Sequence, residues 1–258
     1  LFSVVVFHFR GISVEHLASA QKIGTDATLL AGYLRVHGGE WGLSGETRGA
    51  DLGAGCGVIG LLLAQRWPHL HVDLVEKDAL SAGESQFNAV NTQLSERATA
   101  VHAALPQWTP THPLDWAVSN PPYFKGLPAG NERRDAARHQ SHLPPNALAH
   151  WFHRWVKPNG WLAMVVPEPR DYISSLGSPV RWVAFRTLHH EEPKRHVVFW
   201  KNRLHENHAP EPLTEPEQVL SLYDENGLAS VPYRNYCGDL LLRFPERTAA
   251  HRPKSSGV

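Results

Sequence analysis

The sequence has few cysteines and no long hydrophobic run. Cys56 and Cys237 are its two cysteines and stand far apart among 258 residues, so a disulfide framework is not expected and a cytoplasmic location fits. The longest apolar stretches, residues 58–64 and 161–167, are far shorter than the roughly 20 residues that cross a bilayer. Residues 1–9 are apolar but have no basic leader and no small-residue cleavage site. We therefore predict neither a membrane segment nor a signal peptide.

The sequence also has no excess of positive or negative charge. The chain carries 25 basic and 25 acidic residues, so a polyanion must be bound by a local basic patch and not by the overall charge. Its 17 histidines lack the ligand spacing of a structural zinc site, and a helical His-Glu-x-x-His is missing, so no metal is expected. Trp151 and Trp155, at i,i+4 spacing, are expected to pack in the core.

Hydrophobic patterns predict alternating strands and helices. Strands are expected over residues 4–9, up to 52, and over 71–76, 98–103, 114–119 and 161–166, and helices over 27–36, 58–67, 78–91 and 146–156. Thr25 and Asp26 are expected to cap the first helix. Residues 37–47 suggest a linker, residues 127–143 a long mobile loop, and residues 180–188 and 196–200 an antiparallel edge. This order predicts one α/β domain with parallel strands and right-handed crossovers.

A glycine-rich sequence, Asp-Leu-Gly-Ala-Gly-Cys-Gly at residues 51–57, follows a strand and opens a helix. Gly53, Gly55 and Gly57 allow a tight turn and close approach of the backbone to an anionic ligand group at the helix start. Glu76 ends the next strand, 25 residues after Asp51, where an acid can accept both ribose hydroxyl protons. The alternatives are a plain glycine turn with a surface glutamate, or a nicotinamide enzyme. The latter favours Gly-x-Gly-x-x-Gly over the Asp-x-Gly-x-Gly-x-Gly found here.

A second motif, Asn120-Pro121-Pro122-Tyr123, follows the predicted strand 114–119. Such strands bring their carboxyl ends to the ligand-binding edge of an open sheet. The two prolines restrict the backbone and leave carbonyls without competing N–H donors. Tyr123 offers a face on which a base can stack, a contact worth roughly 1–3 kcal/mol. The alternative is a strand-ending turn with a core tyrosine.

These groups suit methylation of an exocyclic amine. The amino lone pair of adenine is delocalised into the ring, so the nitrogen is a poor nucleophile. If the Asn120 side-chain oxygen and the Pro121 carbonyl accept its two hydrogens, the nitrogen pyramidalises and its lone pair is aimed at a methyl donor. Alignment and fixed dipoles then supply catalysis without a strong general base.

Several segments together resemble the bacterial tRNA (adenine-N6) methyltransferases that modify the anticodon-loop adenine of a valine tRNA. The matching segments are residues 7–10, 22–30, 51–57, 61–66, 120–124, 137–139, 193–195 and 223–227. The resemblance implies a Rossmann-like class I fold: a mostly parallel seven-stranded sheet with an antiparallel edge strand and helices on both faces. It also implies S-adenosylmethionine as cofactor and tRNA as partner.

The resemblance further implies roles for individual residues. Thr25 and Asp26 would close over the cofactor, with Gly24 letting the backbone approach. The implied cofactor-binding residues are Gly24, Thr25, Asp26, Asp51, Gly53, Gly55, Gly57, Glu76 and Asn120, and the implied catalytic residues are Asn120, Pro121, Pro122 and Tyr123. Two positions depart from the family. Ala27 replaces a usual glycine, and residues 101–105 lack the usual aspartate, so the hydrogen bond to the cofactor adenine near Leu105 must come from another group or be absent.

The domain boundaries and the RNA-binding surface are predicted less directly. Residues 1–46 are expected to form an N-terminal strand and cofactor-capping segment, residues 47–245 the methyltransferase core, and residues 246–258 a disordered tail. Two basic groups are expected to contact RNA phosphates on either side of the acceptor pocket. They comprise Arg133, Arg134, Arg138 and His139 on the long loop, and Lys194, Arg195, Lys201 and Arg203 around the last strands.

Three other functions remain possible at this point. A ribosomal-RNA guanine-N2 methyltransferase and a protein glutamine-N5 methyltransferase face the same lone-pair problem. The glutamine enzymes usually carry a helical domain before the glycine loop, for which the first 47 residues leave little room. A different class is a non-catalytic RNA-binding protein that retains a vestigial fold. Asp51, Glu76, Asn120 and Tyr123 are all present, which favours an active enzyme.

Overall fold

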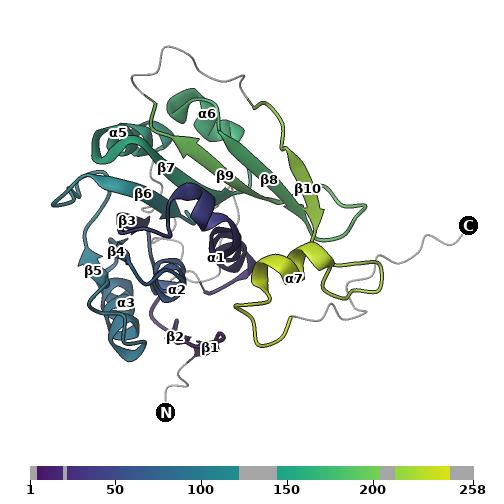
Figure 1. Ribbon diagram of the computed structural model, residues 1–258, viewed down its shortest axis with the longest axis horizontal. Coiled ribbons are helices and arrows are strands. Elements are labelled where there is room, and N and C mark those ends of the chain that lie inside the picture. Colours follow the sequence, from purple (N-terminus) through teal and green to yellow (C-terminus); the bar gives the residue numbers. More distant parts are fainter. Residues whose placement is uncertain (1–4, 20–21, 122–143, 204–212, 245–258) are drawn as a thin grey trace, which may run out of the picture.

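The computed structural model describes residues 5–19, 22–121, 144–203 and 213–244. An eight-stranded sheet runs through the molecule, with helices on both faces, and a two-stranded hairpin lies beside it (Figure 1). The predicted Rossmann-like α/β fold is thus confirmed. The sheet has eight strands where seven were expected.

The strand order explains the additional strand. In spatial order the sheet contains β10 (Gln218–Ser221), β8 (Arg181–Arg186), β9 (Arg195–Lys201), β7 (Val156–Val166), β6 (Leu114–Ser119), β3 (Thr47–Leu52), β4 (Leu70–Glu76) and β5 (Ala98–His102). Strand β9 runs antiparallel to both β7 and β8, and the other pairs are parallel. The antiparallel strand was expected at the edge. It lies inside the sheet instead, because β8 pairs with the side of β9 that faces away from β7, and β10 then adds to β8 in parallel and forms the edge.

Helices cover the two faces of the sheet and enclose two separate cores. One core joins the sheet to α1 (Thr25–His37), α2 (Val58–Arg66), α3 (Ala79–Asn91) and α7 (Val231–Cys237). The other joins it to α5 (Pro145–Trp155) and α6 (Arg170–Leu176). Alternate residues of β7 divide between the cores, Ala163 and Val165 facing the first and Leu162 and Met164 the second. Trp151 is fully buried in the second core, as predicted.

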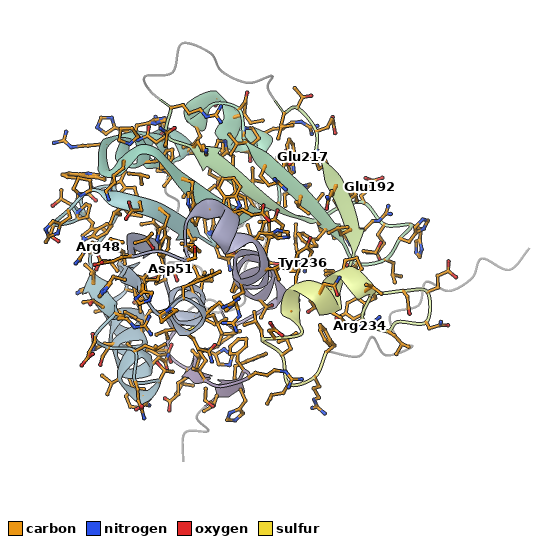
Figure 2. The ribbon with its side chains drawn as sticks, viewed as in Figure 1. Arg48, Asp51, Glu192, Glu217, Arg234 and Tyr236 are labelled. Carbon is orange, nitrogen blue, oxygen red and sulfur yellow. The ribbon has the colours of Figure 1, made fainter. Side chains whose placement is uncertain are left out.

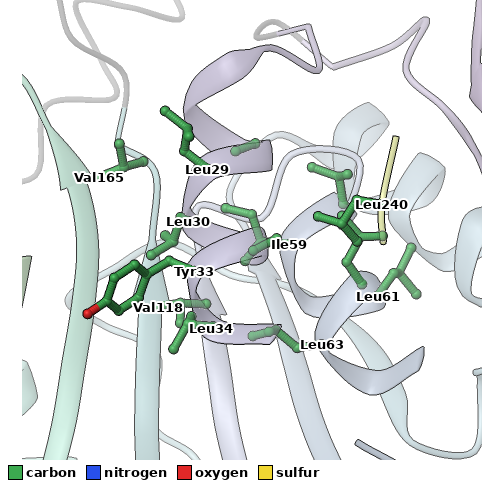
Figure 3. Packing of buried hydrophobic residues seen from close by; sticks show 14 of the residues in the cluster. Leu29, Leu30, Tyr33, Leu34, Ile59, Leu61, Leu63, Val118, Val165 and Leu240 are labelled. Carbon is green, nitrogen blue, oxygen red and sulfur yellow. The ribbon is translucent and has the colours of Figure 1, made fainter. Parts of the chain in front are cut away.

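Helix α1 is buried on several sides because the sheet, α2 and α7 all pack against it. Leu30 and Leu34 of α1 lie between α2 and the sheet, close to Ile59 and Val118 (Figure 3). Gly32 lets α7 approach, since a Cβ there would meet the Tyr236 carbonyl oxygen at 2.5 Å. The position of α1 relative to the sheet is therefore tightly fixed by packing.

Several local predictions were wrong. Thr25 does not cap α1: the cap residue is Gly24, which has no side chain to make a capping hydrogen bond. Residues 157–160 were expected to separate a helix from a strand, but β7 already begins at Val156, which pairs with Leu114. The expected linker contains a 3-10 helix, η1 (Gly38–Trp41). Strand β2 (Ser13–Glu15), paired with β1 (Val6–His8), was missed along with β10, α6 and α7, all of seven residues or fewer.

No helix of the described segments is long and apolar enough to cross a membrane. Both cysteines are buried and free. The Cys237 thiol lies 3.6 Å from the Thr28 carbonyl oxygen, which joins α7 to α1.

Candidate active site

Three predicted site residues stand in one row across the sheet. Leu52 of β3 pairs with Val75 of β4 on one side and with Ser119 of β6 on the other. One residue further along each chain segment, Gly53 follows β3, Glu76 ends β4 and Asn120 follows β6. Because parallel strands end at a common edge, the glycine loop, the acid and the acceptor motif meet there.

The glycine loop turns through three left-handed residues. Gly53, Gly55 and Gly57 have φ angles of 74°, 55° and 82°, which disfavour any other residue. The backbone N–H groups of Gly53 and Ala54 both donate to the Val75 carbonyl, at 2.9 and 3.0 Å. A Cβ at Gly53 would meet no atom of the described segments within 4 Å, so these segments leave open space at this point of the loop. A ligand can approach the backbone there.

Glu76 is tied to the loop by its carboxylate. One oxygen accepts the Gly55 N–H at 2.9 Å, and the other accepts the Asp78 N–H at 2.9 Å. Asp78 in turn caps α3 by accepting the Ser81 N–H. Each Glu76 oxygen keeps a further lone pair, because a carboxylate offers about four acceptor positions. The side chain is held in a fixed orientation and can still accept hydrogen bonds from a ligand.

Asp51, labelled in Figure 2, belongs to β3, and its buried side chain forms a hydrogen bond with α2. Its Oδ2 accepts the Gly60 N–H at 2.9 Å, and its Oδ1 is buried and has no hydrogen-bond partner among the residues that the structure describes. Burial raises the pKa of Asp51 to about 7; the Gly60 hydrogen bond opposes the rise, and the nearby Glu76 carboxylate adds to it. Asp51 therefore stabilises the glycine loop through its hydrogen bond to α2. Because the residue is only 1 % exposed, it cannot contact a large ligand directly.

A second buried acid, Glu84 of α3, was missed by the sequence analysis. Its carboxylate accepts three hydrogen bonds, from Ala18 N–H at 2.7 Å, Ser19 N–H at 2.9 Å and the Ser19 hydroxyl at 2.6 Å. The Ser19 side chain lies beside the glycine loop, since a Cβ at Gly55 would be 3.8 Å from Ser19 Oγ. Glu84 thus anchors the N-terminal segment next to the predicted cofactor loop.

Asn88, one helical turn after Glu84, makes a second anchor. Its side-chain oxygen accepts the Glu15 N–H at 2.9 Å, and its amide donates to the carbonyls of Glu15 and Cys56 at 2.8 and 2.9 Å. One buried amide therefore joins α3, the hairpin and the glycine loop. A sequence signal existed, because Glu84 and Asn88 are polar residues on the buried face of an amphipathic helix.

Lys22 stabilises the next part of the N-terminal segment by hydrogen bonds to residues 16 and 17. Its ammonium group donates to the carbonyls of His16 and Leu17, the latter at 2.8 Å. The Ile23 N–H is 3.1 Å from His16 Nδ1. Burial and the nearby Lys22 charge lower the pKa of His16, which favours the neutral ring that accepts this hydrogen bond. Lys22, in the segment 22–30 that resembles the methyltransferase family, thus has a structural role.

Asp26 follows in the first turn of α1 and pairs with Arg195, the first residue of β9. The two side chains are 26 % and 28 % exposed. Thr25 and Gly24 precede Asp26, with Gly24 exposed at the helix start. Asp26, predicted to bind the cofactor, and Arg195, predicted to bind RNA, are therefore in direct contact.

The acceptor motif begins where β6 ends. Asn120 and Pro121 are half-buried, and the preceding Ser119 donates its hydroxyl to the Leu52 carbonyl at 2.7 Å. This bond fixes the end of β6 to the end of β3. Pro122 and Tyr123 lie outside the described residues, and so do Arg133, Arg134, Arg138 and His139.

The other four predicted RNA contacts are divided between two edges of the sheet. Lys194 precedes β9 and Arg195 begins it. Both lie beside the end of β7, at the same edge of the sheet as Asn120. Lys201 pairs with Trp161 near the start of the apolar part of β7, and Arg203 follows it, so both lie towards the opposite edge. These four residues do not form one patch next to Asn120.

Residues 103–105 follow β5 at the cofactor edge and include no acid. The Ala103 N–H donates to the Glu76 carbonyl at 3.0 Å, and Ala103 and Leu105 pack against the second core. The position beside β5 therefore offers apolar contact where the resembled family usually has an aspartate. Among the described residues, no group of three or more His, Cys, Asp or Glu side chains is arranged to hold a metal ion.

The sequence is similar to known methyltransferases along most of its length. The sequence profile of the methyltransferase small domain matches residues 17–181, which include the glycine loop, Glu76 and Asn120. A protein of Porphyromonas gingivalis named tRNA1(Val) (adenine(37)-N6)-methyltransferase is 31 % identical over 76 % of this chain and 80 % of its own length. A protein of Aeromonas hydrophila with the same name is 37 % identical over 62 % of this chain, a match that spans 66 % of the Aeromonas protein.

Solved structures share the fold at lower identity. A predicted O-methyltransferase from Agrobacterium tumefaciens has a TM-score of 0.62 at 18 % identity, covering 83 % of this chain and 97 % of its own. The 16S rRNA N2 methyltransferase of T. thermophilus, solved with AdoMet and guanosine, has a TM-score of 0.54 at 20 % identity and covers 78 % of this chain and 50 % of its own.

Proposed function

Since the chain belongs to the tRNA1(Val) (adenine(37)-N6)-methyltransferase family and matches the methyltransferase small domain, we propose that it methylates the N6 amino group of an adenine in tRNA. The methyl donor is S-adenosylmethionine, and the anticodon-loop adenine of a valine tRNA is the proposed target. The observation that carries the proposal is the row formed by Gly53, Glu76 and Asn120 at one edge of the sheet. A methyl donor on the first two residues would lie beside the third.

The residues around the glycine loop fit this cofactor. The open space above Gly53 admits the methionine part, and the start of α2 places N–H groups and a positive dipole end near a carboxylate. Glu76, oriented by Gly55 and Asp78, keeps lone pairs for the ribose hydroxyls. Gly24, Thr25 and Asp26 would close over the bound cofactor. When bound, the cofactor supplies an electrophilic methyl group on a sulfonium.

Asn120 is the proposed catalytic residue. Its side-chain oxygen and the Pro121 carbonyl would accept the two hydrogens of the adenine amino group, which turns the nitrogen lone pair towards the methyl donor. The Ser119–Leu52 hydrogen bond holds the strand end, so these acceptors are in place before substrate binds. Pro122 would stiffen the loop, and Tyr123 would stack on the flipped base.

Nucleoside analysis of a defined reaction tests the proposal. We would incubate the protein with deuterated S-adenosylmethionine and a valine tRNA transcript, digest the RNA, and quantify methylated nucleosides by mass spectrometry. The expected product is N6-methyladenosine, lost when guanine replaces adenine 37 in the transcript. Labelled N2-methylguanosine, label in protein glutamine, or no transfer at all would each show that the proposal is wrong.

A further inference from the structure

Asp26 and Arg195 come from segments with different predicted tasks. Asp26 belongs to the segment expected to close over the cofactor, and Arg195 belongs to the group expected to contact RNA phosphates. In the structure they form an ion pair across 169 residues of sequence. One partner cannot be moved without affecting the other.

The pair lies at the active edge of the sheet. Val166 of β7 pairs with His196 of β9, and Met164 pairs with Ser119 of β6. Arg195 begins β9 and Asn120 follows β6, and these two strands lie on either side of β7. Since neighbouring strands are about 4.8 Å apart, the backbones at these two positions are separated by roughly 10 Å.

Packing holds α1 from Ala27 onward, whereas the residues immediately before Ala27 are half-buried or exposed. No side chain caps its first turn, and Gly24, with no side chain, is exposed. Lys22 and His16 hold the preceding residues, but they bond within the N-terminal segment. The ion pair joins this turn to a strand of the central sheet. Arg195 is suited to the task because its planar guanidinium is always charged and directional.

We propose that Arg195 is a positioning residue that fixes the first turn of α1 through Asp26, and that it acts in cofactor binding before RNA arrives. This inference rests on the proposed function, in which Gly24, Thr25 and Asp26 close over the cofactor. It replaces the role of Arg195 as a simple phosphate contact. Lys194, its neighbour, pairs with Glu191 on the surface and keeps the phosphate-contact role.

Binding of S-adenosylhomocysteine without RNA provides the test. By calorimetry we expect Arg195→Ala to weaken this binding about tenfold, the scale of one charge-assisted hydrogen bond, and Lys194→Ala to leave it within twofold. In turnover assays Arg195→Ala should raise KM for S-adenosylmethionine more than it lowers kcat. Arg195→Lys, which keeps the charge, should recover part of the affinity and covers the case in which the alanine variant unfolds.

A double-variant cycle separates positioning through Asp26 from a general structural effect. If Arg195 acts through Asp26, then Arg195→Ala should cost little further affinity in an Asp26→Ala background. Additive losses would overturn the proposal. So would unchanged S-adenosylhomocysteine affinity in Arg195→Ala combined with weaker tRNA binding. These readouts need no RNA product, so they remain valid if the methylated nucleoside differs from the proposed one.

Discussion

The two edges of the sheet use acidic side chains differently. At the carboxyl edge, Asp51, Glu76 and Glu84 accept hydrogen bonds from backbone N–H groups. At the amino edge, Asp115 and Glu217 each accept one backbone N–H and in addition pair at the surface with a basic side chain, Lys157 and Arg181 respectively. A carboxylate bound to backbone N–H groups fixes the path of the chain, whereas an exposed ion pair fixes little. The carboxyl edge is therefore held in shape by its acids.

The first consequence concerns Asp51 and is the largest in free energy. Its pKa in the folded protein, about 7, lies above the ordinary value of 3.8, so the folded state binds a proton more tightly than the unfolded chain. The resulting stability is complete below pH 3.8 and is lost as pH rises towards 7. The shift corresponds to roughly 4 kcal/mol.

Urea unfolding between pH 4 and 8 measures this effect. The difference in unfolding free energy between the wild type and Asp51→Asn should change by several kcal/mol over this range, in the direction that disfavours the wild type at high pH. Asp115→Asn, at the amino edge, is the matched control. A constant difference between wild type and Asp51→Asn would contradict the raised pKa.

The next effect is on activity and contrasts the edges directly. Asn120→Ala removes a fixed acceptor from the carboxyl edge, and we expect kcat to fall about 10²- to 10³-fold, as for other preorganised hydrogen-bonding groups. Binding of S-adenosylhomocysteine should stay near the wild-type value. Asn91→Ala, at the exposed end of α3, is the control. Undiminished turnover in Asn120→Ala would remove the proposed catalytic role.

Glu84 gives a smaller effect that separates anchoring from catalysis. In Glu84→Gln an amide NH₂ or a single neutral oxygen must face the donors of Ala18 and Ser19, so at least one hydrogen bond is lost. We expect about 2 kcal/mol of lost stability or cofactor affinity, measured by unfolding and calorimetry. Ser19→Ala, which keeps the backbone donors, should lose less. Gln86→Ala on the exposed face of α3 should lose nothing; equal losses in Gln86→Ala and Glu84→Gln would refute the anchor.

The same contrast explains which features were predictable from the sequence. Asp51, Glu76 and Asn120 were found because each stands at or near the end of a predicted strand, where topology alone gives the location. Glu84 and Arg195 were not assigned their structural roles, because their partners lie 65 and 169 residues away. Nothing local in the sequence specifies such contacts.

Short elements were missed for a related reason. Strand β10 has four residues and α7 has seven, too few for a periodic pattern to stand out. Both are stabilised by packing on β8 and α1. Without β10, strand β8 would be the edge, as expected from the sequence. The number of strands therefore depended on tertiary contacts.

The smallest expected effect belongs to the amino edge. Lys157 Nζ lies 2.6 Å from Asp115 Oδ1, and the two side chains are 48 % and 29 % exposed. Because water screens the pair, Lys157→Ala should cost only about 0.2–1 kcal/mol in unfolding experiments, and the cost should shrink with added salt. Asp115 also accepts the Arg48 N–H at 2.9 Å, so Asp115→Ala should cost more than Lys157→Ala. If the lysine variant instead lost as much stability as Glu84→Gln, exposed ion pairs would matter here as much as buried acceptors, and the distinction between the two edges would fail.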